Sequence, residues 1–389
     1  MKHEELKRLD QETILGTYAR SDVSIVRGRG AVCLSESGRR YIDFTSGIGV
    51  NALGYCDPEW VTAVVRQVVT LQHTSNLYYT EPCALLAKRL TERTGLSKVF
   101  FCNSGAEANE GAIKAARKYG FEKRGIERPE IITLENSFHG RTMATVSATG
   151  QDSFHKFFAP FLEGFTYVPA DDAGRLREAL TERTCAVMIE TVQGEGGVVA
   201  LDAAFVREIA EICAEQDILF IIDEVQTGVG RTGKFYAYEY FDVKPDIVTT
   251  AKALGGGLPI GGILFGEKCA SVLGPGEHGS TFGGNPVACA GGLVILDRLD
   301  EAFLADVRRK AAYITEAISR MPTVKSVSGL GLMLGVDTEG RSAKEVVAAC
   351  ADNGLLLLTA KDKLRLLPPL NITADEIDQG LSVLRAALR

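Results

Sequence analysis

Residues 218–234 read ILFIIDEVQTGVGRTGK, an apolar run that ends in an acid and is followed by closely spaced glycines. A short, continuously apolar run with turn-forming residues beside it is typical of a strand buried on both faces of a sheet. Four similar β-rich runs occur at 98–104, 130–137, 185–192 and 246–253. The sequence therefore predicts several buried strands, one of which presents Asp223 at its carboxyl end.

Helical patterns separate these runs. AEANEGAIKAARKYG (106–120) and DAAFVREIAEICAEQD (202–217) are two examples. Apolar strands that alternate with helices predict an α/β fold, with a mostly parallel central sheet covered by helices on both faces.

The last hundred residues have a different pattern. A helical stretch is followed by two strand-like runs, 324–337 and 363–370, around a further helix. We expect a smaller α+β domain over 288–389, to which an N-terminal segment, 1–50, contributes. The large domain would then cover 51–287.

Composition excludes several classes of protein. The 389 residues are 46% hydrophobic and 24% charged, with a net charge of −7, which is typical of a globular protein that does not bind nucleic acid. No apolar run approaches the roughly 20 residues of a membrane span, and the charged N-terminus resembles no signal segment, so we expect a cytoplasmic protein. Nine cysteines without a C-x-x-C pair and five histidines without metal-ligand spacing predict reduced thiols and no metal.

The glycines within residues 218–234 match two nucleotide-binding patterns. Gly228, Gly230 and Gly233 give G-x-G-x-x-G, and Lys234 completes a Walker A spacing. A Walker A loop needs Ser or Thr after its lysine, and both patterns must open a helix. Here Phe235 follows, and the next residues are aromatic up to a proline. We therefore expect a tight loop rather than a nucleotide site.

Three other features fit a single chemistry. Lys252 lies among small and apolar residues, where the pKa of its amine would fall and the amine would become nucleophilic. Ser104 and Gly105 end a predicted strand and begin a helix, whose N-terminus can bind phosphate, although Ser104 could simply cap that helix. Asp223 ends a neighbouring strand. Pyridoxal 5'-phosphate needs an amine for its aldehyde, an anion site for its phosphate and a carboxylate for its pyridine nitrogen.

Longer motifs surround these residues in a specific order. They are SGIGVNALG (46–54), HTSN (73–76), NSGAEANE (103–110), FHGRT (138–142), QGEGG (193–197), DEVQTGVGRTG (223–233), AKALGGGLPIGG (251–262) and HGSTFGGNP (278–286). With them the chain resembles the class III (ω-amino-acid) aminotransferases of the fold-type I pyridoxal-phosphate superfamily, from about Tyr18 to Asn371. Within that family it is most similar to the members that act on acetylornithine.

The resemblance implies a role for each cofactor-binding residue. Lys252 would bind the cofactor covalently and carry the proton, and Asp223 would pair with the pyridine nitrogen. Phe138 would stack on the ring, and Gln226 would lie near its hydroxyl group. The phosphate would be bound by Ser104, Gly105 and Ala106, and by Thr281 of a neighbouring subunit, so a homodimer is implied. Ala106 departs from the threonine of many relatives.

The resemblance also implies how substrates bind. Arg141 would hold the α-carboxylate of the ω-amino donor, and Arg365 would hold that of glutamate or 2-oxoglutarate. Glu195 would neutralise Arg365 while the donor reacts, and Tyr18 and Ser280 would also contact substrate. The implied reaction moves the δ-amino group of N2-acetyl-L-ornithine to 2-oxoglutarate, giving N-acetyl-L-glutamate 5-semialdehyde and L-glutamate, in arginine biosynthesis.

Several alternatives remain at this stage. Other donors are succinylornithine, ornithine, 4-aminobutyrate and acyl-diaminopimelate or acyl-lysine compounds. Ile48 favours acetylornithine, because ornithine aminotransferases typically have a tyrosine there that contacts the free α-amine. A nucleotide-dependent ATPase or dehydrogenase built on residues 218–234, or a non-catalytic scaffold, would belong to other classes. The failed loop pattern argues against the former, and Lys252 with Asp223 argues against the latter.

Overall fold

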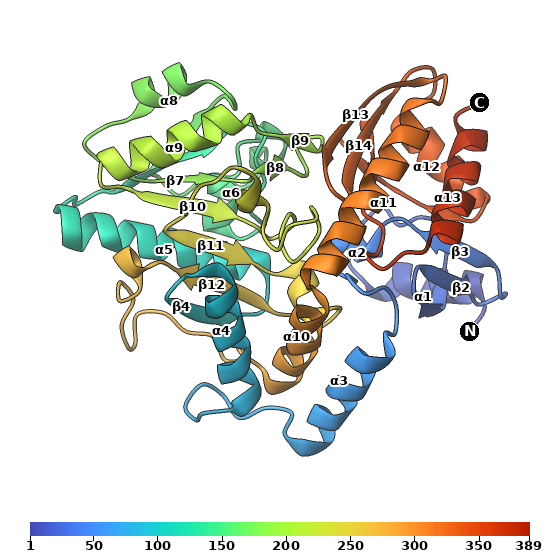
Figure 1. The fold of residues 1–389 in the computed structure, drawn as a ribbon, viewed down its shortest axis with the longest axis horizontal. Coiled ribbons are helices and arrows are strands. Elements are labelled where there is room, and N and C mark those ends of the chain that lie inside the picture. The colour runs from blue at the N-terminus through green and yellow to red at the C-terminus, as the bar shows by residue number, and fades with distance from the viewer.

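The computed structural model describes residues 1–389 and has two lobes (Figure 1). A large α/β lobe holds the middle of the chain, and a smaller lobe holds both ends, with the N- and C-termini on the same side of the molecule. No helix has both the length and the apolar composition to cross a bilayer.

A seven-stranded sheet forms the centre of the large lobe. Its strand order is β4-β12-β11-β10-β7-β5-β6, and every strand is parallel to the others except β12, which is antiparallel to both neighbours. The predicted mostly parallel sheet is confirmed. The strands are β4 (Lys98–Cys102), β5 (Glu130–Leu134), β6 (Phe165–Val168), β7 (Thr184–Ile189), β10 (Leu219–Asp223), β11 (Ile247–Thr250) and β12 (Gly261–Phe265).

Residues 218–222 are continuously apolar because both faces of β10 are covered. Leu219 and Ile221 pack in the core cluster of helix α5 (Gly105–Arg124). Phe220 and Ile222 point to the other face, into the cluster that includes helix α9 (Ala203–Glu215). Successive strand residues alternate between faces, so neither set could be polar.

Both ends of the chain build the smaller lobe. Its antiparallel sheet has the order β13-β14-β17-β16, and a second sheet pairs the N-terminal strands with β15 (Leu355–Leu356) through β3. The predicted boundaries at 50 and 287 stay predictions. The elements are β1 (Ile25–Arg29), β2 (Val32–Ser35), β3 (Arg40–Asp43), α11 (Glu301–Ser319), β13 (Val324–Leu330), β14 (Met333–Thr338), α12 (Ala343–Asp352), β16 (Leu358–Ala360), β17 (Lys363–Leu366) and α13 (Ala374–Ala387).

Three further helices lie below the sheet in the view of Figure 1, and one of them, α10 (Pro286–Arg298), packs against the other two. Those two are α3 (Pro58–Thr70) and α4 (Glu81–Thr94). Asp57 and Asn285 cap α3 and α10, each accepting hydrogen bonds from two backbone N–H groups, and a proline follows each cap. A side-chain acceptor before a proline is a strong helix start, so both boundaries follow from local sequence.

The glycine loop after Asp223, residues 224–234, contacts the small lobe. No helix opens there, and Gly230 and Gly233 have positive φ angles of 84° and 86°, so the predicted tight loop is confirmed. The buried Arg231 donates hydrogen bonds to the backbone oxygens of Leu332 and Pro368 in the small lobe. Burial lowers the pKa of its guanidinium to about 9.

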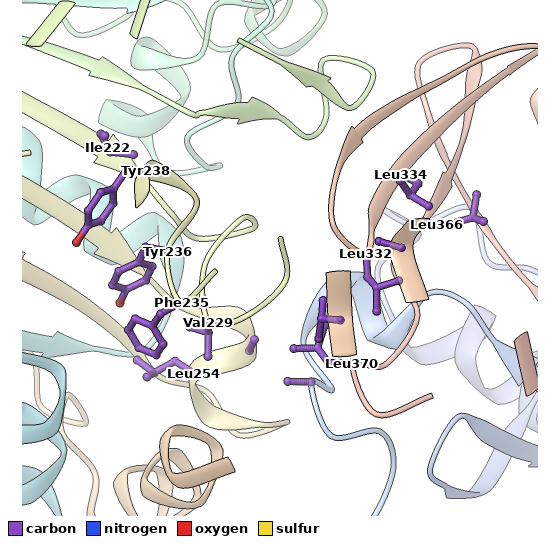
Figure 2. Packing of buried hydrophobic residues seen from close by; sticks show 14 of the residues in the cluster. Ile222, Val229, Phe235, Tyr236, Tyr238, Leu254, Leu332, Leu334, Leu366 and Leu370 are labelled. Atoms are coloured by element: carbon purple, nitrogen blue, oxygen red, sulfur yellow. The ribbon is translucent and has the colours of Figure 1, made fainter. Parts of the chain in front are cut away.

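Apolar side chains continue this contact. Figure 2 shows Val229 and Phe235 on the large-lobe side and Leu332 and Leu370 on the small-lobe side. All four belong to one buried cluster that extends through both lobes. The two lobes therefore share a core where they meet.

Gly331→Ala should disrupt the junction of the lobes. Gly331 has a φ of 56°, and an added Cβ would lie 2.3 Å from the backbone carbon of Thr232. We expect a loss of about 2 kcal/mol or more in the free energy of unfolding, since positive φ alone costs a non-glycine residue about 1–2 kcal/mol. Urea unfolding measures it. In the control Gly340→Ala, φ is 89° and no atom lies within 4 Å of the added Cβ. This variant should lose only the free energy that a positive φ costs a non-glycine residue. Equal losses in the two variants would contradict a steric clash at Thr232.

Candidate active site

A cavity of about 430 Å³ opens beside the carboxyl ends of the sheet strands. Ligands of open α/β sheets bind at this edge. Eight of the predicted site residues line the cavity: Ser104, Gly105, Ala106, Phe138, Arg141, Asp223, Gln226 and Lys252. The fold thus brings together side chains that are up to 148 positions apart, counted from Ser104 to Lys252.

Asp223 is held by three hydrogen bonds at the end of β10. Its side chain is 4% exposed. Oδ2 accepts from Asn109 Nδ2 at 2.7 Å and lies 2.9 Å from His139 Nδ1, while Oδ1 accepts from the Val225 N–H at 3.0 Å. The Thr249 hydroxyl donates to Asn109 Oδ1 at 2.7 Å, which fixes that amide. A buried carboxylate requires such donors, and Oδ1 keeps capacity for one more.

Sequence reasoning missed the residues that hold Asp223. Asn109 lies on the buried face of α5, where an apolar residue is the usual occupant, and that mismatch was the available signal. His139 follows Phe138 and is 2% exposed, with Nε2 unpaired in the chain. Nothing local to either residue points to Asp223, because helix α5 and the loop after β5 meet Asp223 only in the folded chain.

Lys252 lies in a strained turn that follows β11. Its φ is 43°, in the left-handed region that a lysine rarely adopts. Burial of the amine lowers its pKa to about 8, and nearby Glu195 opposes that shift. Strain of this kind persists only where the surroundings impose it, and it gathers at active sites. The result is an amine facing the cavity whose neutral fraction near physiological pH is far larger than that of an ordinary lysine.

The N-terminus of α5 forms the anion-binding side of the cavity. The Ser104 hydroxyl caps the helix by accepting from the Glu107 N–H at 3.2 Å, while its predicted contact with a phosphate stays a prediction. An added Cβ on Gly105 would lie 2.5 Å from Cγ1 of Val225. Only glycine lets the helix start come this close to the loop after Asp223. The first N–H groups of a helix have no intrahelical acceptor and can bind phosphate.

A second charged group links the cavity to the small lobe. Arg365, on β17, is 4% exposed and donates to Glu195 Oε1 at 2.5 Å and to Gln226 Oε1 at 3.1 Å. Gly194 permits this arrangement, because a Cβ there would lie 2.4 Å from Nε2 of Gln226. The guanidinium is therefore paired in this structure, although Glu195 could be replaced by another carboxylate.

Glu190, also missed from sequence, joins two loops of the site. Its carboxyl oxygens accept from the N–H groups of Phe138 and Gly194, at 2.8 and 3.3 Å. Burial raises its pKa to about 7. Because one loop carries Phe138 and the other carries Glu195, this carboxyl fixes the aromatic wall of the cavity relative to the Arg365 pair.

Five predicted residues lie outside the cavity lining. Two of them, Arg365 and Glu195, form the pair beside Gln226 described above, and the other three are Ser280, Thr281 and Tyr18. Ser280 accepts hydrogen bonds from Asn103 Nδ2 and the Gly283 N–H, and Thr281 is exposed beside it. Tyr18 is 74% exposed and lines a separate hollow with helix α1 (His3–Thr13). Their roles stay predictions; that of Thr281 requires a second subunit.

The fold, a large mostly parallel sheet with a lysine and an acid at its carboxyl edge, is that of pyridoxal-phosphate-dependent aminotransferases. The family model described as aminotransferase class-III matches residues 17–388. The chain therefore belongs to the class-III aminotransferases and is an enzyme of amino-group transfer, which excludes the nucleotide-dependent and scaffold alternatives.

Individual relatives are similar over nearly their whole length. The acetylornithine aminotransferase of Haemophilus ducreyi is 51% identical, covering 100% of this chain and 99% of that protein. That of Caldanaerobacter subterraneus is 46% identical, covering 96% and 97%. Among solved structures, the ornithine aminotransferase of Toxoplasma gondii superposes with a TM-score of 0.96 at 32% identity, covering 100% and 95%. The N-acetylornithine aminotransferase of Stenotrophomonas maltophilia gives 0.84 at 37%, covering 98% and 97%.

Glu195→Ala should destabilise the protein although Glu195 is itself partly exposed. The variant leaves the buried Arg365 without a carboxylate, which should cost about 1–3 kcal/mol in the free energy of unfolding. Urea unfolding without added dicarboxylate measures it. The matched control is Glu208→Ala, which breaks an exposed pair with Arg177 and should cost less than about 1 kcal/mol. A loss no larger than the control's would mean that Arg365 does not depend on Glu195.

Proposed function

We propose that the protein uses pyridoxal 5'-phosphate to move the δ-amino group of N2-acetyl-L-ornithine to 2-oxoglutarate. The products would be N-acetyl-L-glutamate 5-semialdehyde and L-glutamate, in a cytoplasmic step of arginine biosynthesis. One observation carries the proposal: an amine of lowered pKa, a buried carboxylate and the first residues of helix α5, Gly105 and Ala106, face a single cavity.

The residues of the cavity fit the cofactor group by group. Lys252 supplies the amine for the aldehyde, and Asp223 Oδ1 can accept a hydrogen bond from a protonated ring nitrogen. The N–H groups at Gly105 and Ala106 suit the phosphate, and Gly105 lets the helix start approach Val225, whose Cγ1 would lie 2.5 Å from an added Cβ. When bound, pyridoxal 5'-phosphate supplies an aldehyde that takes up amino groups and a ring that accepts electrons from the substrate carbon.

The chain's own residues would orient the cofactor and move protons. Lys252 would hold the cofactor, then move the proton between the substrate carbon and the cofactor. Asp223, kept in place by Asn109 and His139, would keep the ring nitrogen protonated. Phe138 would cover one face of the ring, and Gln226 would reach its hydroxyl group from beside Arg365. Thr281 would bind the phosphate of a second subunit in a homodimer.

Two arginines would let one cavity serve two substrates. Arg141 would hold the carboxylate of the donor, which leaves its terminal amine at the reacting position. Arg365 would hold the carboxylate of 2-oxoglutarate after Glu195 gives up its place. Arginine suits both tasks because its planar fork meets a carboxylate with two hydrogen bonds.

The choice of acetylornithine rests on relatives and on one residue. The relatives at 51% and 46% identity are named acetylornithine aminotransferases. Ile48 is 44% exposed and apolar, which suits an acylated nitrogen better than a charged α-amine. Succinylornithine, ornithine, 4-aminobutyrate and acyl-diaminopimelate remain the alternative donors.

Mixing the cofactor-loaded protein with each amine, without 2-oxoglutarate, tests the donor. N2-acetylornithine should change the absorption spectrum of the bound cofactor faster than ornithine, succinylornithine or 4-aminobutyrate, because Arg141 would hold its α-carboxylate and Ile48 suits its acylated α-nitrogen. Stopped-flow absorbance measures the rates. Lys252→Ala should abolish the change. A faster reaction with another amine would overturn the choice of donor but not the type of reaction.

The rate of cofactor capture should depend on pH through Lys252. Its neutral amine is the nucleophile, and its pKa is lowered from 10.5 to about 8. Capture of pyridoxal 5'-phosphate by cofactor-free protein should therefore rise as pH rises towards 8 and then level off. Absorbance at a series of pH values measures it, with N-acetyl-lysine as the unperturbed control. A rate that keeps rising to pH 10.5, as for the control, would contradict the burial effect.

A further inference from the structure

Arg141 is oriented within the chain by aromatic faces. Its guanidinium carbon lies 4.3 Å from the ring centroid of Phe154 and 5.5 Å from that of Phe138. The two rings meet edge to face, with centroids 5.4 Å apart and planes at 61°. A cation over an aromatic face is attracted by the ring's negative charge distribution. Phe154 is the nearer ring and therefore has the stronger hold.

Phe154 is itself held from both sides. It lies in the short helix α7 (Asp152–His155) and is half-buried. Before it, Gln151 donates from Nε2 to the backbone oxygen of Ser137 at 2.9 Å, which ties the segment to the loop of Phe138. After it, His155 Nε2 lies 2.8 Å from the backbone oxygen of Val146. The ring is thus a fixed platform rather than a mobile surface side chain.

We propose that Phe154 is a positioning residue that presents Arg141 to the carboxylate of the amino donor. The contact with the ring uses no hydrogen-bond acceptor, so the N–H groups of the guanidinium stay available for a bidentate carboxylate. Arginine otherwise loses much side-chain freedom when it binds an anion, and a preformed orientation reduces that loss. The proposal rests on the proposed function, because it takes Arg141 as the donor clamp.

This arrangement affects only one of the two substrates. Arg365 holds the 2-oxoglutarate carboxylate in the proposed reaction, and it contacts Glu195 and Gln226 rather than the aromatic platform. Removal of the Phe154 ring should therefore weaken the donor and leave 2-oxoglutarate unaffected. It should also leave unaffected a donor that has no α-carboxylate.

The experiment compares two donors on the holoenzyme. N2-acetylornithine carries the α-carboxylate, and N-acetylputrescine is the same amide and amine without it. For Phe154→Leu, kcat/KM for acetylornithine should fall by about 3- to 30-fold relative to that for N-acetylputrescine. The kcat/KM for 2-oxoglutarate should not change, because it reports only the second half-reaction. Phe154→Tyr, which keeps the aromatic face, should retain the wild-type ratio, and Phe154→Met replaces the leucine variant if that one folds poorly.

Two further variants distinguish a wrong role for Phe154 from a wrong role for Arg141. Phe157→Leu removes an exposed ring that pairs with Lys156 on the same segment, and it should leave the donor ratio at the wild-type value. Arg141→Ala should lower the ratio at least as much as Phe154→Leu. An unchanged ratio in Phe154→Leu beside a lowered one in Arg141→Ala would overturn the role of Phe154 alone. Unchanged ratios in both would overturn Arg141 as the clamp, and equal losses for both donors would reduce Phe154 to a structural residue.

Discussion

The buried carboxylate of Asp223 is the constraint on which the site depends. A charge at the end of a covered strand requires donors, and three segments supply them: α5 through Asn109, the loop after β5 through His139, and the backbone at Val225. Meeting that requirement brings the helix N-terminus, the aromatic wall and the strand end together. The same contacts that stabilise the fold thus place the proposed cofactor groups around one cavity.

The proposed reaction adds a second requirement, a cavity that receives two different acids. The large lobe carries Arg141 on its aromatic platform, and the small lobe carries Arg365 on β17, paired with Glu195 of the large lobe. The two lobes are joined by the shared core at the glycine loop. Aminotransferases alternate between an amine and an oxo acid, so one clamp on each lobe, with an internal carboxylate to mask one of them, fits that alternation.

Local pattern was sufficient for much of this structure. The apolar runs ending at Cys102, Leu134, Ile189 and Asp223 predicted strands because residues buried on both faces of a sheet admit no polar alternation. Other features depend on contacts distant in sequence. The antiparallel direction of β12, the pairing of β3 with β15, and the bonds of Asn109 and His139 to Asp223 leave no trace in neighbouring residues. The strained backbone of Lys252 is likewise imposed by its surroundings.

The central claim is that Lys252 is the amine that binds the cofactor. Its most direct test is to load the protein with pyridoxal 5'-phosphate, fix the protein–cofactor bond by borohydride reduction, and map the modified lysine by peptide mass spectrometry. The account predicts a single modified residue, Lys252. Modification of another lysine, such as Lys234 in the glycine loop, or a spread over several surface lysines, would contradict it.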